Sequence, residues 1–269
     1  MNKLNEISKA QRDEEKILIA NVMDKVKAVK ERSGFKSTVF LNMAQIYEID
    51  NILKIKHFEN YEFFGGLEDA ERKMLIVYSD EVYTYLKSRN EIYDQIISVI
   101  KVTLPKGQKE EYTHKTYLGA LMKLGIKREM IGDIIVTNNG AEIIIAKEIE
   151  KFLLNDLRLL TRFQKAKIEK IELDCISYIK PETKIMKINI PAMRLDAIVA
   201  EIIHSSRNEA QKVIDEERVF INFKEEISYS KKVEENDIIT VRGKGRFRII
   251  KITGTTKSGR LNVEVETFS

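Results

Sequence analysis

Hydrophobic residues at helical spacing dominate the first third of the chain. A helix ending before Gly34 is predicted by apolar residues three or four positions apart: Ile17, Leu18, Val22, Val26 and Val29. The stretch "NMAQIYEIDNILKI" predicts a second helix, with Asn42 as its N-terminal cap. In "YEFFGGLEDAERKMLIVYS" we expect two strands joined by a turn at Gly65-Gly66. These elements predict a small α/β domain over residues 1–90.

The middle third alternates between strand and helix patterns. The β-branched run "IISVIKVTL" predicts a buried strand, and "THKTYLGALMKLG" predicts a helix between Thr113 and Gly125. The stretch "DIIVTNNGAEIIIA" predicts a hairpin that turns at Asn139-Gly140. A second helix, "KEIEKFLLNDLRLLTR", and a last strand, "AKIEKIEL", follow. The inner face of this second helix is predicted to hold Ile149, Phe152, Leu153, Leu157 and Leu160.

The resulting order over residues 91–180 is β-α-β-β-α-β, the split βαβ arrangement of ferredoxin-like and RNA-recognition folds. RNA-recognition domains stack bases on aromatic residues of their sheet, whereas "EIIIA" offers only aliphatic side chains. Two interpretations of this domain therefore stay open: a packing or spacer domain, and a domain that binds RNA directly.

The last part of the chain, residues 181–269, predicts a third small domain. It begins with "ETKIMKINI", a linker or an edge strand, and continues with two amphipathic helices, "MRLDAIVAEIIH" and "SSRNEAQKVIDEE". Four short strands follow: "RVFIN", "DIITVRG", "GRFRIIKITG" and "RLNVEVETF". Two helices packed on a small twisted sheet complete an α+β chain of three small domains.

Composition excludes several classes of protein. The chain of 269 residues has one cysteine and three widely spaced histidines, so we expect no internal disulfide, no metal site and no cofactor. No apolar run has membrane-spanning length, and the start of the chain lacks the apolar core of a secretion signal. We therefore expect a cytoplasmic protein that does not insert into membranes.

Charge is segregated near the C-terminus, although the net charge is only +4. Between Asp237 and Glu264 there is no acidic residue, while there are seven cations. Within "VRGKGRFRII", four of these cations fall on every second residue and would share one face of a strand: Arg242, Lys244, Arg246 and Arg248. Such a face is either solvated or paired with an anion. The lack of nearby carboxylates and the Ser206-Arg207 helix start favour RNA phosphate.

The C-terminal stretch resembles the RNA-binding domain first described in ribosomal protein S4. The matching residues run "MRLDAIVAEIIHSSRNEAQKVIDEERVFIN" and then "DIITVRGKGRFRI". The resemblance implies an RNA-facing surface made of Arg194, Ser206, Arg207, Gln211, Arg242, Lys244 and Arg246. Simpler roles are a cap for Ser206, a water-facing side chain for Gln211, and a weak exposed ion pair between Arg194 and Asp196. Glu217 stands where this domain usually has glycine, so we expect a non-glycine residue at positive φ there.

The resemblance extends along most of the chain. "FFGGLEDAERK" and "THKTYLGALMKLGIKREMIGDI" are similar to segments of the YlmH family of bacterial RNA-binding proteins. That family implies an N-terminal domain, an RNA-recognition-like middle domain and a C-terminal S4-type domain. It also implies roles at the large ribosomal subunit, in the rescue of stalled translation complexes and, in some bacteria, in cell division.

Two other classes of function are alternatives to RNA docking. S4-type domains accompany enzymes, and "RLD" at 194–196 resembles the catalytic triplet of pseudouridine synthases, but here it opens a helix of the terminal module. The sequence lacks the glycine-rich loop of a methyltransferase and any nucleophile–base pattern, so we expect no enzyme. The third class is a cell-division adaptor that binds a protein partner through residues 1–90. The favoured partner is structured RNA: large-subunit ribosomal RNA first, and tRNA as a second candidate.

Overall fold

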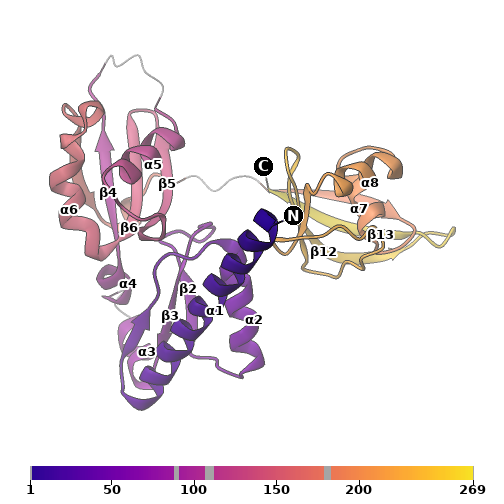
Figure 1. Cartoon of the computed structure of the whole chain (residues 1–269), viewed down its shortest axis with the longest axis horizontal. Helices are drawn as coiled ribbons and strands as arrows, with labels where there is room; N and C mark the ends of the chain where they lie inside the picture. The colour runs from indigo at the N-terminus through magenta and orange to yellow at the C-terminus, as the bar shows by residue number, and fades with distance from the viewer. Residues whose placement is uncertain (1, 88–90, 107–111, 179–182, 269) are drawn as a thin grey trace. The chain divides into compact units, whose positions relative to one another are not determined.

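The chain folds into two compact units, residues 1–178 and 179–269, and its class is α+β (Figure 1). The structure, a computed structural model, describes residues 2–87, 91–106, 112–178 and 183–268. The predicted domain boundary at residue 180 lies outside the described residues, next to the division between the units. The boundary predicted at residue 90 falls inside the first unit, whose division into two domains stays a prediction.

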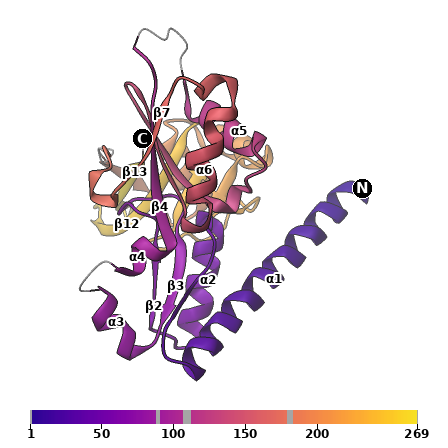
Figure 2. The same ribbon diagram turned by 90° about the vertical axis from the view of Figure 1, so that its left-hand side faces the viewer.

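The first unit begins with a helical segment around a small sheet. Its elements are α1 (Asn2–Glu31), β1 (Phe35–Ser37), α2 (Met43–Ile55), β2 (Tyr61–Phe64), β3 (Met74–Tyr78) and α3 (Asp80–Lys87). The strands form an antiparallel sheet in the order β1-β3-β2. Helix α1 packs against this segment through Val22, Val26 and Val29, whereas Ile17 is exposed. The N-terminal part of α1 extends away from the sheet and α2 (Figure 2). Asn42 caps α2 as predicted, in a reciprocal pair with Gln45.

The rest of the first unit confirms the predicted β-α-β-β-α-β order. After α4 (Glu91–Ile96) it consists of β4 (Ile97–Thr103), α5 (His114–Lys123), β5 (Ile131–Thr137), β6 (Gly140–Ala146), α6 (Glu150–Asp156) and β7 (Lys167–Ile171). Short 3-10 turns occupy Arg128–Met130, Lys147–Ile149, Leu157–Leu159, Thr161–Phe163 and Leu173–Cys175. The four strands form an antiparallel sheet in the order β5-β6-β4-β7, as a split βαβ arrangement requires.

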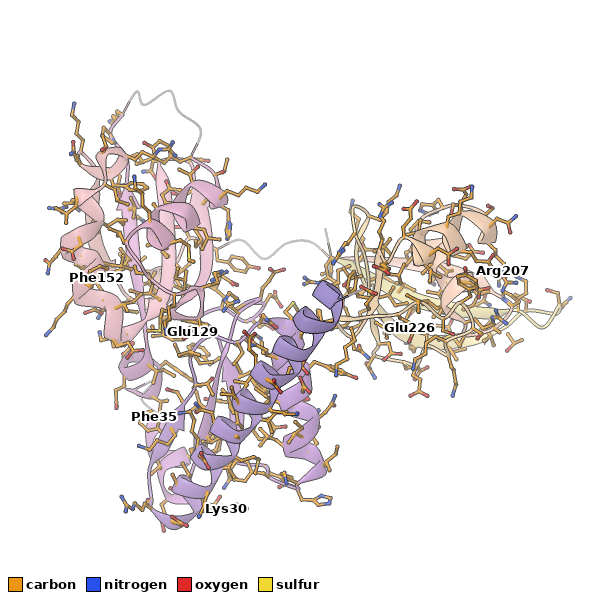
Figure 3. All side chains as sticks on the ribbon, viewed as in Figure 1. Lys30, Phe35, Glu129, Phe152, Arg207 and Glu226 are labelled. Carbon is orange, nitrogen blue, oxygen red and sulfur yellow. The ribbon has the colours of Figure 1, made fainter. Side chains whose placement is uncertain are left out.

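Two local predictions in this region are wrong. The β5–β6 hairpin turns at Asn138 and Asn139, and Gly140 already pairs with Thr137 as the first residue of β6. Gly140 is needed for another reason, since a Cβ there would lie 1.8 Å from the carbonyl oxygen of Val102 on β4. The predicted second helix breaks into 3-10 turns after α6, and Phe152 lies on its exposed side (Figure 3).

Both faces of the four-stranded sheet are buried. On one face α5 and α6 cover side chains that include Ile100, Ile143 and Ile145. On the other face Ile144 and Val99 pack against the N-terminal segment, in a cluster that includes Ile76 of β3. RNA-recognition domains stack bases on an open face of their sheet. Among the described residues, this sheet has no open face of that kind.

A half-buried arginine connects the N-terminal segment to this sheet. The Arg72 side chain donates hydrogen bonds to the backbone oxygens of Ile131 (3.0 Å) and Phe40 (2.9 Å). The Asp133 carboxylate in turn accepts bonds from the backbone amides of Glu71 (2.8 Å) and Arg72 (3.3 Å). Burial, and then the charge of Arg128, lowers the pKa of Arg72 to about 10. These contacts join the two stretches that resemble YlmH segments, "FFGGLEDAERK" and "GIKREMIGDI".

The second unit packs two helices on one face of a six-stranded sheet. Its elements are β8 (Lys184–Ile190), α7 (Leu195–Ile202), α8 (Arg207–Asp215), β9 (Val219–Ile221), β10 (Lys224–Glu225), β11 (Ile238–Val241), β12 (Gly245–Thr255) and β13 (Leu261–Phe268). The strand order is β10-β9-β11-β12-β13-β8, which confirms that "ETKIMKINI" supplies an edge strand. The core includes Ile198 and Ile214 of the helices and Val241, Phe247 and Ile249 of the strands. We call the sheet face away from α7 and α8 the outer face.

Candidate nucleic-acid interface

A fully buried carboxylate holds two arginines at the start of the helices. Arg194 is the residue before α7. Arg207, labelled in Figure 3, is the first residue of α8. Arg194 donates from Nε and Nη2 to the two carboxylate oxygens of Asp196, at 3.1 and 3.2 Å. Arg207 Nη2 donates to Asp196 Oδ2 at 2.6 Å. The Asp196 side chain is 0% exposed, whereas those of Arg194 and Arg207 are 44% and 50% exposed.

The expected weak, exposed pair between Arg194 and Asp196 is therefore wrong. Burial on its own raises the pKa of the Asp196 carboxyl, but hydrogen bonds and charges from Arg194 and Arg207 outweigh it, and the net shift is downward. The backbone amide of Ala197 also donates to Oδ1, at 2.9 Å. The carboxylate is thus ionised and fully occupied, and each guanidinium keeps other N–H groups that face solvent.

Ser206 and Gln211 complete the helix-start group. The Ser206 hydroxyl accepts a hydrogen bond from the backbone amide of Glu209 at 3.2 Å, which confirms its role as the cap of α8. Gln211 lies one helical turn after Arg207 and is half-buried. Contact of either side chain with RNA stays a prediction. We use "helix-start group" for Arg194, Asp196, Ser206, Arg207 and Gln211.

The single basic strand expected from "VRGKGRFRII" is wrong. Strand β11 ends at Val241, which pairs with Gly245 at the start of β12, so Arg242 and Lys244 lie in the tight turn between the strands. Gly243 sits at the tip with φ +79°, a conformation that L-residues rarely adopt. Arg246 and Arg248 do lie on β12, opposite the buried Phe247 and Ile249. We call Arg242, Lys244, Arg246 and Arg248 the hairpin group.

Carboxylates that are distant in sequence reach part of this group. The guanidinium of Arg248 lies 3.4 Å from Glu266, and the ammonium of Lys251 lies 3.8 Å from Glu264. Both glutamates are on β13, which pairs with β12. No acidic residue is close to this basic stretch in sequence, but the pairing of β12 with β13 supplies carboxylates to Arg248 and Lys251. Among the described ion pairs, none includes the exposed Arg242 or Lys244.

Aromatic rings accompany three of the four cations in the hairpin group. The guanidinium carbon lies 4.5 Å from the Phe220 ring centre for Arg242, 5.8 Å from Phe223 for Arg246, and 5.1 Å from Phe268 for Arg248. Sequence reasoning missed these phenylalanines. They belong to three separate stretches, and only strand pairing brings them beside the arginines.

The predicted site residues thus fall into two groups within the second unit. Asp196 brings Arg194 and Arg207 together, and the β11–β12 hairpin gathers the other four cations. Arg218, which follows α8, was also missed: its Nη2 donates to the backbone oxygen of Arg242 at 2.8 Å. This bond ties the end of α8 to the hairpin turn.

At the end of α8, Glu217 has φ +55°, so the expected positive φ at a non-glycine residue is confirmed. Elsewhere, the described residues contain no cluster of three or more His, Cys, Asp or Glu side chains that could hold a metal ion. No helix in the described part of the chain has the length and apolar character needed to cross a membrane.

Two family models match the chain in the regions described above. Residues 91–175 match "Putative RNA-binding domain in YlmH", and residues 193–239 match "S4 domain". A relative in Bacillus subtilis (strain 168) is 28% identical over 265 residues, which are 95% of this chain and 96% of the relative. The chain is thus similar to the YlmH family in its middle region and to S4 domains near its C-terminus.

The relative in Bacillus subtilis is named "Ribosome-associated protein quality control protein P2". A solved structure, "Cell division protein ylmH from Streptococcus pneumoniae", is also similar, with 18% sequence identity and a TM-score of 0.46. That match covers 60% of this chain and 93% of the solved one. What the family models show is a region similar to the YlmH RNA-binding domain, followed by one similar to the S4 domain.

Proposed function

We propose that this protein is a non-catalytic, cytoplasmic RNA-binding protein that docks on structured RNA through its S4 domain. Its proposed target is ribosomal RNA of the large subunit, with tRNA as a second contact, and its proposed role is in translation or the rescue of stalled ribosomal complexes. The observation that carries the proposal is the pair of half-exposed arginines held by one buried carboxylate. The name of the Bacillus subtilis relative supports the ribosomal role.

The helix-start group suits a phosphate ligand. Arg207 stands at the N-terminus of α8, where the helix dipole and free backbone amides favour an anion. Asp196 neutralises one positive charge but fixes both guanidinium planes, and a planar guanidinium matches phosphate geometry. A pre-positioned pair loses less conformational freedom on binding than two free side chains would.

The hairpin group adds exposed cations on a turn that RNA can approach closely. Arg242 and Lys244 are exposed, and Gly243 between them has no Cβ. Each phosphate that a cation neutralises releases condensed counterions, so we expect the affinity for RNA to fall steeply as salt rises. Recognition of this kind follows RNA shape and backbone more than base sequence.

Catalysis by the "RLD" triplet does not fit the geometry. The Asp196 carboxylate has no exposed surface and is held by two guanidinium groups and a backbone amide. A catalytic aspartate has to reach its substrate, so a carboxylate without exposed surface supports a non-catalytic role.

The proposal is tested by co-sedimentation of the full chain with large ribosomal subunits at low and moderate salt. The hairpin variant Arg242→Glu/Lys244→Glu changes two exposed turn residues, so we expect it to fold. A second variant, Arg207→Gln, removes a guanidinium without placing a second carboxylate beside Asp196. We expect the native protein to travel with the subunits and both variants to remain mostly in the supernatant.

The matched control is Lys16→Glu/Lys27→Glu on α1, two exposed lysines whose replacement gives the same change in net charge as the hairpin variant. We expect it to sediment like the native protein. Equal sedimentation of the native and S4-domain variants would overturn the proposal. Loss confined to the α1 variant would make the N-terminal segment the anchor and would favour an adaptor that binds a partner through residues 1–90.

A further inference from the structure

The three arginine–phenylalanine pairs belong to the six-stranded sheet and its turns. Strand pairing places most of these side chains on the outer face of that sheet. Thr240 of β11 pairs with Phe220 of β9 on one side and with Arg246 of β12 on the other. Arg246 in turn pairs with Phe268 of β13. Directly paired residues point to the same face of a sheet. Phe220, Thr240, Arg246 and Phe268 therefore form one row on the outer face.

The next row contains Arg248, which pairs across the sheet with Ile238 and Glu266. Arg248 lies two residues after Arg246, so its side chain leaves the same face, and it stands over the Phe268 ring. The intervening residues Phe247 and Ile249 point to the core under the helices. Arg242 extends this face beyond the end of β11, over the ring of Phe220. This part of the outer face thus places guanidinium groups beside aromatic rings.

Packing of the hydrophobic core does not explain this arrangement, because Phe220, Phe223 and Phe268 are not members of that core. The contact of a cation with a ring is weak at exposed sites, and the outer face lies away from the hydrophobic core. A surface that bound only phosphate would need cations but no rings. Rings and guanidinium planes side by side are instead the groups on which unpaired RNA bases stack.

We propose that this outer face binds unpaired RNA bases by stacking, in addition to the phosphate contacts of the helix-start group. The inference rests on the proposed function, because it assumes that the second unit docks on RNA. A fully paired helix hides its base faces, so the ligand is a loop, a bulge or a single-stranded end. The site is composed of Phe220, Phe223, Arg242, Arg246, Arg248 and Phe268.

The first part of the test compares two RNA hairpins of equal length and charge on the full native chain. One has an ordinary unpaired loop, and the other has an abasic loop that keeps every phosphate but lacks the bases. Stacking strengthens binding by roughly 5- to 150-fold per base. We expect the ordinary loop to bind at least about tenfold more tightly, with similar salt dependence for both RNAs because the phosphate contacts are shared.

The second part uses the variant Phe220→Leu/Phe268→Leu, which keeps every cation and most of the apolar volume. We expect it to lose most, but not all, of the preference for the ordinary loop, because Phe223 and the guanidinium groups of the site remain for stacking. The matched control, Phe220→Tyr/Phe268→Tyr, retains the rings and should still prefer the ordinary loop. Thermal melting checks that both variants fold, and the comparison of the two hairpins on the native chain needs no variant.

The outcomes separate this inference from the function on which it rests. Equal, salt-dependent binding of both hairpins by the native chain would overturn base stacking and leave RNA docking intact. No binding of either hairpin would overturn both. A leucine variant that kept the preference for the ordinary loop would also overturn the proposal, because the rings would then have no part in it.

Discussion

At the scale of single residues, Asp196 determines how two cations are presented. Its carboxylate has no exposed surface, yet it orients guanidinium groups that are themselves about half exposed. A carboxylate in this position is worth more than a surface ion pair, because it is shielded from solvent and accepts several hydrogen bonds. The same residue therefore contributes to the stability of the second unit and to the shape of its basic surface.

We expect Asp196→Asn to lower the free energy of unfolding of the second unit by about 1–3 kcal/mol, because hydrogen bonds to a buried charged group are lost. Hydrogen exchange of the backbone amides in α7 measures this locally. The control is Glu225→Gln, which neutralises an exposed carboxylate on β10 and should leave exchange unchanged. Unaltered exchange in Asp196→Asn would show that the carboxylate does not hold the helix starts.

The pH dependence of this effect follows from the lowered pKa of Asp196. A carboxyl whose pKa is lower in the folded than in the unfolded state adds stability above its unfolded pKa of about 3.9. That stability is lost as the pH falls through the pKa that the carboxyl has in the folded state. The difference between native protein and Asp196→Asn should therefore be constant from neutral pH to about pH 5 and shrink below about pH 4.

At the scale of elements, the ends of α8 connect the two groups of cations. Its first residue, Arg207, binds Asp196, and Arg218, just beyond its end, bonds to the hairpin turn. Between α8 and Arg218, Glu217 holds a left-handed conformation with φ +55°, which is unfavourable for a residue with a Cβ. The sequence indicated this strain because glycine is usual there in S4-type domains.

We expect Glu217→Gly to raise the free energy of unfolding of the second unit by up to about 1 kcal/mol, since glycine adopts positive φ without steric cost. The gain is reduced by the greater freedom of glycine in the unfolded chain. Glu217→Ala is the matched control, because it removes the same charge but keeps a Cβ. Denaturant unfolding should show a gain for glycine alone; equal gains for both variants would point to charge rather than strain.

At the scale of the whole molecule, the first unit is built around a sheet that is covered on both faces. The aliphatic residues of β6, all of them buried, pack against helices on one side and against the N-terminal segment on the other. The sequence left open whether this domain packs against other parts of the protein or binds RNA directly. Since its sheet is covered on both faces, the sheet itself serves packing. If the middle region also binds RNA, the contact has to use another surface.

We expect Arg72→Ala to destabilise the first unit by about 2–4 kcal/mol, because it leaves the buried carbonyl oxygens of Phe40 and Ile131 without a donor. Limited proteolysis and thermal unfolding measure the loss. The neighbouring Lys73→Ala removes one exposed bond, to the backbone oxygen of Glu68, and should have little effect. Equal stability of the two variants would show that the Arg72 contacts do not hold the N-terminal segment in place.

The sequence by itself determined the features that depend on residues only a few positions apart. Helical spacing located α1 and α2, Asn42 and Ser206 were recognised as caps, and the β-α-β-β-α-β order was predicted correctly. The inward direction of Val241, Phe247 and Ile249 also followed from alternation alone. These features are local because neighbouring backbone groups and side chains set them.

Only the tertiary structure decided which distant residues meet. The turn at Arg242–Lys244 divides the basic stretch between two elements, and the pairing of β12 with β13 brings Glu266 to Arg248 and Phe268 to Arg246. Burial of Asp196 likewise depends on α7 packing against strands that come later in the chain. Alternation along a strand fixes which face a side chain occupies, but its partner across the sheet depends on register. Register is set by the packing of whole segments, which spacing in the sequence does not encode.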